Sequence, residues 1–207
     1  MAGPIQETAG EDGVGDQVAI RGLVARALHD PEAFAALYDI YVDWVYSYSY
    51  RRLGSKAEAE DVTAQTFLAA LSNFSRFSWR GGGFGAWLFR IARNLCWDCL
   101  KRRARTIPYR ADAVDAAGSE AKLAGGGGVD ETRDPEEALL AAERLSSLRG
   151  LIQELPRAQN EVVLLKYAAG LGNREVAAAT GRSLTAVSSL LNRAREKLRE
   201  GLAKDHG

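Results

Sequence analysis

The chain of 207 residues is poor in several residue types that commonly carry chemistry. Its two cysteines and two histidines leave little material for a metal site built from cysteine and histidine ligands. The sequence contains no Ser/His/Asp set, no metal-ligand cluster and no phosphate-cradling glycine loop followed by lysine. We therefore expect no catalytic residue, no metal, no cofactor and no enzymatic activity.

Long apolar runs are also absent. No segment approaches the roughly 20 apolar residues that a membrane-spanning helix requires. The first residues, MAGPIQETAGEDGVGD, are acidic and rich in glycine, unlike a signal peptide. These features predict a cytoplasmic protein without membrane insertion. Alternating, strand-like patterns of useful length are missing as well, so we expect an all-helical fold.

Neither sign of charge predominates overall, because 27 lysines and arginines balance 27 aspartates and glutamates. The charges are nevertheless unevenly distributed: residues 1–30 and 111–137 are acidic, and residues 31–110 and 138–207 are basic. Basic surfaces attract a polyanion and acidic stretches avoid it. Two basic blocks separated by an acidic one therefore favour contact with nucleic acid.

The charge blocks also predict the domain organisation. Residues 1–29 form an N-terminal extension that we expect to be partly disordered, and residues 204–207 form a tail. Two small helical domains are predicted at residues 30–105 and 135–203. Residues 106–134 contain four consecutive glycines and few large apolar side chains, so this acidic, glycine-rich segment is predicted to be a flexible linker.

The segment GLGNREVAAATGRSLTAVSSLLNRAREKL, residues 170–198, is typical of two helices joined by a tight turn. Asn173 and Ser183 can cap the two helices, and Gly181 lies where the turn needs a positive φ. Apolar residues in the second helix recur at spacings of three and four and predict a core-facing stripe: Leu184, Val187, Leu191, Ala194 and Leu198. This pattern indicates a helix-turn-helix that places its second helix in a DNA major groove. The alternative is an ordinary helical hairpin with a solvated polar face.

Three helices are predicted in the first domain. The first begins with the cap Asp30 and Pro31 and ends near Gly54, and Ser55 starts the second with a capping box. The third, residues 84–105, carries many more basic than acidic side chains, which favours phosphate contact. It also contains a C-x-x-C motif, whose thiols are either packing residues or a redox pair: Cys96 and Cys99.

Between the second and third of these helices lies the aromatic loop NFSRFSWRGGGFGAW. Aromatic rings beside arginines suit unstacked bases, because every base has a π-face and a nearby phosphate. The alternative is that Phe74, Phe77 and Trp87 belong to the core of a small bundle. That alternative leaves Trp79 and Arg80 at the loop tip unexplained.

Four segments, in this order and spacing, resemble the extracytoplasmic-function (ECF) group of bacterial RNA polymerase sigma factors. They are PEAFAALYDIY, AEDVTAQTFLAAL, FGAWLFRIARNLCWDCLKRR, and LPRAQNEVVLLKYAAGLGNREVAAATG with the arginine-bearing helix after it. The resemblance implies a sigma-2-like bundle that binds core polymerase and recognises and melts the −10 element. It also implies a sigma-4-like domain that recognises the −35 element. The implied partners are the clamp and flap of core RNA polymerase, promoter DNA that is duplex at −35 and single-stranded at −10, and an anti-sigma factor.

The resemblance also implies the site residues. Those expected to bind core polymerase are Asp61, Gln65, Phe67 and Leu68. Those expected to contact and melt the −10 element are Trp79, Arg80, Phe84, Arg90, Arg93, Asn94, Asp98, Lys101, Arg102 and Arg103. Those expected to contact the −35 element are Arg182, Thr185, Ser188, Ser189, Asn192, Arg193 and Arg195.

The chain departs from the family pattern at two places. Ala64 and Gln65 stand where many relatives carry Gln-Glu, and Ser188 and Leu190 stand where many carry a lysine and an arginine. Fewer cations in the second helix of the helix-turn-helix should weaken its attraction to phosphates. The alternative function is a helix-turn-helix repressor or activator that does not join RNA polymerase. Such a protein would not need the aromatic loop or the basic third helix.

Overall fold

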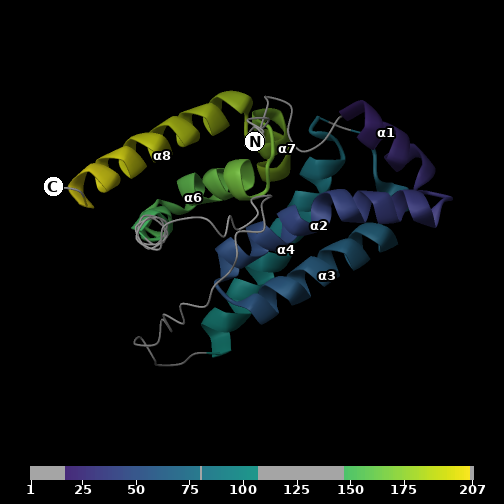
Figure 1. The fold of residues 1–207 in the computed structure, drawn as a ribbon, viewed down its shortest axis with the longest axis horizontal. Coiled ribbons are helices and arrows are strands. Elements are labelled where there is room, and N and C mark those ends of the chain that lie inside the picture. Colours follow the sequence, from purple (N-terminus) through teal and green to yellow (C-terminus); the bar gives the residue numbers. More distant parts are fainter. Residues whose placement is uncertain (1–16, 80, 107–146, 206–207) are drawn as a thin grey trace, which may run out of the picture.

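The computed structural model describes residues 17–79, 81–106 and 147–205 (Figure 1). Over these ranges the chain forms helices and turns and no strand, so the predicted all-helical fold is confirmed. None of the helices in these ranges is long and apolar enough to cross a membrane. Arg80 and all of the predicted linker except Thr106 lie outside the described residues.

The first bundle consists of four helices and one short turn. The elements are α1 (Gln17–Arg26), α2 (Pro31–Leu53), α3 (Lys56–Ser72), the 3₁₀ turn η1 (Phe74–Arg76) and α4 (Gly83–Thr106). Helix α2 packs against the other three helices and fills the centre of the bundle. Its side chains Leu37, Tyr41, Val45 and Tyr48 are fully buried, which follows from their spacing of three and four.

Local capping sets the limits of α2 and α3 where the sequence predicts them. The Asp30 carboxylate accepts a hydrogen bond from the backbone N–H of Glu32 at 3.0 Å. Gly54 ends α2 in the left-handed conformation, with φ 71°. The Ser55 hydroxyl then accepts a hydrogen bond from the backbone N–H of Glu58 at 3.4 Å. This two-residue connection folds α3 back along α2.

Helix α1 is an element that the sequence patterns above do not identify. Its Ile20 and Val24 are 1% and 7% exposed, and the helix packs on α2. The apolar residues Ile20, Leu23, Val24 and Ala27 recur at helical spacing, so the signal is present, although the helix is short. Part of the N-terminal extension thus belongs to the core of the first bundle.

The second bundle contains the helix-turn-helix. Residues 147–154 are helical and precede α6 (Arg157–Val163), which continues into the π-helical turn η2 (Leu164–Ala168). Helices α7 (Asn173–Thr180) and α8 (Leu184–Asp205) follow, and α8 packs on both α6 and α7.

The predicted apolar stripe of α8 is confirmed at its centre and wrong at its start. Val187, Leu191 and Ala194 are buried, and Leu198 packs against the core. Leu184 is 45% exposed. It is the first residue of the helix, beyond the reach of the core that α6 and α7 provide.

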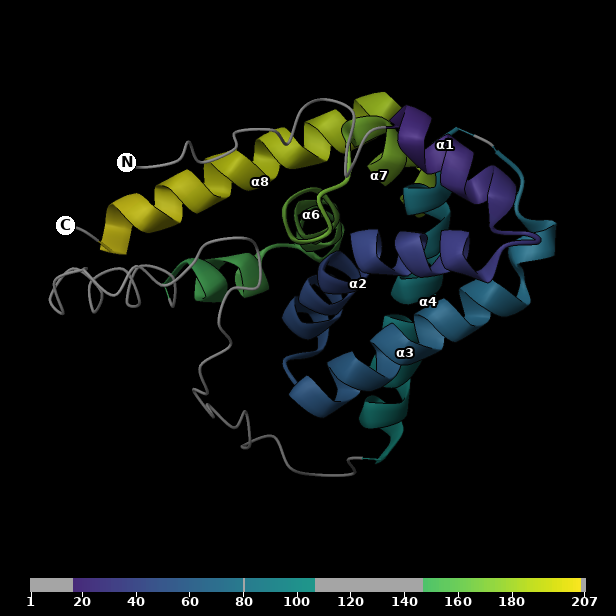
Figure 2. The ribbon, with the colours of Figure 1, turned by 45° about the vertical axis from the view of Figure 1, so that its right-hand side comes forward.

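The two bundles pack against each other in this structure. Helix α4 contacts α7, and α2 contacts η2. In both ribbon views α6 lies between α8 and the first bundle, whereas α3 lies on the side away from α8 (Figures 1 and 2). The face of α4 that meets α7 carries some of the arginines predicted to bind DNA.

Candidate nucleic-acid and polymerase interfaces

The turn between α7 and α8 has the geometry of a helix-turn-helix. Gly181 is left-handed, with φ 70°, and the Ser183 hydroxyl accepts a hydrogen bond from the backbone N–H of Ala186 at 3.2 Å. Both predictions are confirmed. The predicted cap Asn173 is wrong: the N-cap position is Gly172, whose N–H donates to the Glu175 carboxylate at 2.9 Å. Because the helix begins one position earlier than the sequence suggests, Asn173 lies in its first turn.

The face of α8 opposite its core stripe is polar and accessible. Ser188 is half-buried, and the remaining predicted −35 contacts are exposed: Arg182, Thr185, Ser189, Asn192, Arg193 and Arg195. The Arg195 guanidinium donates to the Tyr167 hydroxyl at 3.1 Å, which ties α8 to η2. Hydroxyl, amide and guanidinium groups on one exposed helix face can contact phosphates and base edges.

Helix α4 carries a second polar face. Arg90, Asn94, Asp98 and Lys101 are exposed and recur at spacings of three and four, so they lie on one side of the helix. Lys101 pairs with Asp98 at 3.5 Å, but both side chains are more than half exposed, so the pair contributes little stability.

The remaining three basic residues predicted on α4 lie off this face: Arg93, Arg102 and Arg103. Arg103 reaches the end of α2 and the start of α3, where it donates to Glu58 at 3.0 Å and to the Leu53 carbonyl at 3.2 Å. Its guanidinium therefore ties α4 to the connection between α2 and α3. Arg102 is exposed beside it.

The aromatic loop is mostly packed. Phe74 and Phe84 are buried, and Phe77 and Trp87 pack partly buried against the same core. The core interpretation of Phe74, Phe77 and Trp87 is therefore confirmed, and Phe84 lies beneath the loop with its ring 1% exposed.

Trp79 is half-buried at the start of the glycine run. Its ring meets Phe77 edge-on at 5.8 Å, and the Arg21 guanidinium of α1 lies 4.8 Å from its centroid. Helix α1 therefore holds the Trp79 side chain in place. The prediction that the loop contacts unstacked bases depends chiefly on this residue.

An open groove runs between the end of α3 and α4. Its volume is about 360 Å³, and it is lined by Ala69, Asn73, Arg76, Trp87, Ile91, Asn94 and Leu95. The apolar wall and the polar ends formed by Arg76 and Asn94 suit a flat ring with hydrogen-bonding edges.

Helix α3 presents an exposed face of mixed character, on which Asp61, Gln65 and Leu68 share one side. The Gln65 amide donates to the Asp61 carboxylate at 2.8 Å. Leu68 and Leu71 are 64% and 54% exposed. Phe67 is buried and packs against Tyr38 at 4.6 Å, so it supports this face from below. Exposed leucines beside a carboxylate are typical of a protein-binding surface.

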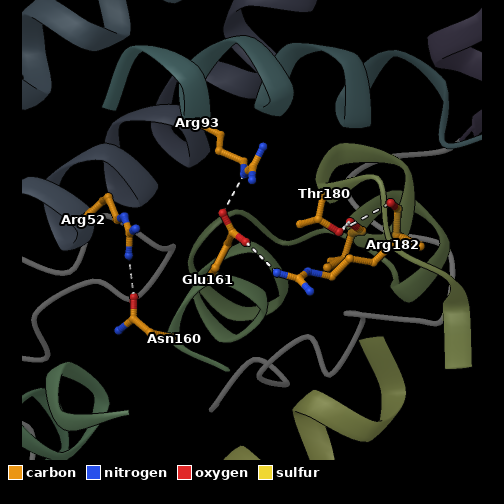
Figure 3. A network of polar contacts seen from close by, with 8 residues as sticks. Arg52, Arg93, Asn160, Glu161, Thr180 and Arg182 are labelled. Atoms are coloured by element: carbon orange, nitrogen blue, oxygen red, sulfur yellow. Dashed lines mark hydrogen bonds and ion pairs between the residues drawn. The ribbon is translucent and has the colours of Figure 1, made fainter. Parts of the chain in front are cut away.

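The contact between the bundles centres on Glu161, which sequence patterns alone do not single out. Its carboxylate is 5% exposed and accepts a hydrogen bond from Arg93 Nε at 2.6 Å (Figure 3). The Arg182 guanidinium lies 3.7 Å from its other oxygen. The segment NEVVLL places this acidic residue beside an apolar run, but that pattern alone does not specify that the carboxylate is buried.

Further polar contacts cross the same interface. Arg52 donates to the Asn160 side-chain oxygen at 2.8 Å (Figure 3). Arg90 donates to the Ala178 carbonyl. The Trp97 ring lies 3.3 Å from the Arg157 guanidinium and 5.1 Å from that of Arg52, measured to the ring centroid. The interface thus combines buried charge, hydrogen bonds and cation–π contacts.

The glycine run lies directly against α7. A Cβ on Gly82 would be 2.6 Å from the Ala178 Cβ and 3.1 Å from the Glu175 Cα. A Cβ on Gly85 would be 3.0 Å from a Glu175 carboxylate oxygen. Contacts under 3.0 Å are not tolerated without movement, so close approach of the second bundle requires glycine here.

The two thiols of the C-x-x-C motif are free and buried. Burial raises the pKa of the Cys96 thiol to about 11 and also raises the pKa of Cys99. A raised pKa disfavours the nucleophilic thiolate, so the packing interpretation of these residues fits the structure better than the redox interpretation.

The fold and these surfaces define a helical DNA-binding protein of two bundles. Residues 37–106 match Sigma-70 region 2, and residues 145–198 match Sigma-70, region 4. The ECF RNA polymerase sigma factor BldN of Streptomyces coelicolor is 36% identical over 92% of this chain and 68% of its own length. SigW of Bacillus subtilis is 33% identical over 84% of this chain and 90% of its own length. The structure of CnrH in complex with the cytosolic domain of CnrY has a TM-score of 0.64 at 25% identity, covering 90% of this chain and 99% of that one.

The chain belongs to the ECF family of RNA polymerase sigma factors. It is an alternative sigma factor, a subunit for transcription initiation, and the prediction from resemblance is confirmed at that level. A repressor that acts without polymerase is not favoured, because it leaves the region 2 match without a role. The matched relatives are sigma factors, which are not enzymes.

Proposed function

We propose that this sigma factor divides promoter recognition among three surfaces on different helices. The exposed face of α3 binds core RNA polymerase, the aromatic loop and α4 hold the opened −10 element, and α8 reads the −35 duplex. The observation that carries this proposal is that α3, α4 and α8 each present exposed side chains suited to a different partner. The proposed domains are residues 30–105 and 135–203, joined by residues 106–134.

The polymerase surface is proposed at Asp61, Gln65 and Leu68, with Phe67 as its buried support. Burial of exposed leucines supplies affinity, at about 25 cal/mol per Å² of apolar surface. The Asp61 carboxylate supplies orientation, because a charge at the rim of an interface selects a partner of opposite sign. The clamp of core polymerase is the proposed partner of this face.

The −10 surface is proposed to combine stacking with phosphate contact. Unstacked bases lie on aromatic rings, and the groove beside Arg76 and Asn94 offers room for one such base. The guanidinium and ammonium groups of α4 follow the backbone of the displaced strand. Trp79, and Arg80 next to it in the sequence, are proposed to separate the strands at the loop.

The −35 surface is proposed on the exposed side of α8. Arginines at its edges position the helix on phosphates, and the hydroxyl and amide groups between them meet base edges. Ser188 and Leu190 replace two cations common in the family, so the salt dependence of duplex binding should be shallower by up to about two units of slope.

Two further features of the chain follow from family membership. We propose that the chain acts in the cytoplasm, where bacterial RNA polymerase and the chromosome are found. We also propose that an anti-sigma factor regulates it, in analogy with the complex of CnrH with CnrY. The polymerase flap is the proposed neighbour of the second bundle.

Run-off transcription with purified core polymerase on a randomised promoter library tests this function. The chain should select templates that share a −35 and a −10 element at constant spacing, and core polymerase alone should select none. Failure to bind core polymerase or to start transcription on any template would contradict the proposal.

A further inference from the structure

Arg195 lies at the far end of the row of side chains that α8 is proposed to present to the −35 duplex. The row consists of Thr185, Ser188, Asn192 and Arg195, whose spacings of three and four place them on one side of the helix. At 1.5 Å per residue, Arg195 is about 15 Å along the helix from Thr185. A helix in a major groove contacts base edges mainly near its N-terminus. Arg195 is therefore placed to contact the phosphate backbone.

A neutral hydroxyl holds the Arg195 guanidinium. Its Nε and Nη2 atoms both donate to the Tyr167 hydroxyl oxygen, at 3.2 Å and 3.1 Å. Two bonds from one edge of a planar group fix the orientation of its plane, whereas a single bond would allow it to rotate. This contact uses only one edge of the guanidinium, which has five N–H donors in all, so donors remain for a phosphate.

The charge of Arg195 is oriented but not neutralised. In the part of the chain that the structure describes, no carboxylate lies within 4.0 Å of its guanidinium. Arg103, by contrast, lies 3.0 Å from the Glu58 carboxylate, which compensates its charge. A hydroxyl acceptor fixes the geometry of a guanidinium without reducing its attraction for a polyanion. The other three residues of the row are uncharged, so the attraction of this row to phosphates depends on Arg195.

Tyr167 reaches Arg195 from η2, a turn of uncommon geometry. The Ala169 N–H donates to the Leu164 carbonyl, five residues earlier, at 3.0 Å, which is the π-helical pattern. Ala168 is buried in the core, whereas Tyr167 next to it is 55% exposed. The turn thus anchors the backbone of Tyr167 in the second bundle and leaves its hydroxyl beside α8. Single π-helical turns occur frequently at functional sites.

We propose that Tyr167 is a positioning residue for DNA recognition, which orients Arg195 so that its guanidinium meets a phosphate of the −35 duplex. This inference rests on the proposed function for the assignment of Arg195 to that duplex. Tyr167 belongs to none of the three surfaces proposed above and acts through Arg195. Because the orientation exists before DNA binds, less side-chain entropy is lost in binding than for an arginine that moves freely.

Tyr167→Phe in the full chain tests the proposal, because it removes the hydroxyl and keeps the ring. Fluorescence anisotropy measures affinity for a fluorescein-labelled duplex, selected from a random pool by binding to the natural chain, over a range of salt concentrations. Tyr167→Phe should lower the affinity about twofold to tenfold, the range that corresponds to one hydrogen bond. It should also make the dependence of log affinity on log salt shallower by up to about one unit of slope, as expected when one phosphate contact is lost. A substitution that only loosened the fold would lower the melting temperature and leave that slope unchanged.

Two arginine variants separate positioning from a direct effect of the hydroxyl. In an Arg195→Ala chain, Tyr167→Phe should cost no further affinity, because no guanidinium is left to orient. The matched control is Arg193→Ala, which removes another exposed arginine of the same helix. In an Arg193→Ala chain, Tyr167→Phe should cost as much affinity as it does in the natural chain.

All three side chains are exposed, so these substitutions leave the core of the second bundle intact, and circular dichroism checks that each variant is folded. An unchanged affinity and salt slope for Tyr167→Phe would refute the positioning role. Equal losses with and without Arg195 would also refute it, since the hydroxyl would then act independently of that arginine. If Arg195→Ala itself binds the duplex as tightly as the natural chain, the assignment of Arg195 to the −35 surface is wrong. That result is a failure of the proposed function, and the inference falls with it.

Discussion

Replacement of Trp79 by alanine tests whether the aromatic loop opens the promoter. The ring contacts Phe77 edge-on at 5.8 Å and lies 4.8 Å from the Arg21 guanidinium. Such an aromatic pair contributes about 0.5–1.5 kcal/mol and an accessible cation–π contact about 0.5–1 kcal/mol. The substitution therefore costs about 1–2.5 kcal/mol of folding free energy, less than the 5–15 kcal/mol typical of a domain.

The functional loss should exceed what this structural cost explains, because a cost of this size leaves the chain folded. Stacking of one base on an aromatic ring is worth about 1–3 kcal/mol, which corresponds to about a fivefold to 150-fold loss of open complex. Binding to the −35 duplex should not change, because Trp79 lies in the first bundle. The assay is permanganate reactivity of unpaired thymines in the −10 element, compared with duplex binding measured on the same preparation.

A second tryptophan supplies the control. Trp44 on α2 is 36% exposed and lies outside the aromatic loop. Trp44→Ala removes the same side chain and should open promoters as the natural chain does. If Trp79→Ala opens promoters within about twofold of the natural chain, no base stacks on this ring. If both variants lose opening equally, the effect is one of stability and the loop assignment is refuted.

Three other predictions concern single surfaces. Asp61→Arg should weaken binding to core polymerase by about tenfold or more, since it reverses a rim charge, and unchanged affinity in a pull-down titration would remove Asp61 from the interface. Substitution of Thr185, Ser188 and Asn192 together should shift the preferred −35 sequence in promoter selection and leave the −10 preference unaltered; the reverse would invert the domain roles. Because burial raises the pKa of the Cys96 thiol to about 11, its thiolate fraction near neutral pH is small, and alkylation should be slow until urea unfolds the chain. Rapid alkylation of the folded chain would reveal an accessible thiolate.

Features that depend on a few neighbouring residues were predictable from the sequence. Asp30, Gly54 and Gly181 define helix ends because each satisfies or relaxes the backbone next to it, whatever the rest of the chain does. The helix-turn-helix followed from the same kind of signal. The cap at Asn173 failed because Glu175 bonds to the Gly172 N–H and competes for the helix start.

Features that depend on contact between distant segments were not predictable. Arg93 and Glu161 are 68 positions apart, and nothing in their neighbourhoods specifies that they meet. A basic residue on a basic helix indicates phosphate contact equally well whether or not a carboxylate from another bundle occupies it. Helix α1 is an intermediate case, since its apolar spacing is visible but its burial depends on α2.

The glycine run at Gly81–Gly83 shows why one pattern permits two structural explanations. Positive φ angles of 59° and 69° at Gly81 and Gly83 account for glycine there through the turn alone. Gly82 is also crowded by the helix that follows it, because a Cβ there would be 2.6 Å from the Cβ of Ala86 in α4. The turn and the start of α4 therefore account for glycine in this loop by themselves, so the glycine run does not predict the contact with α7.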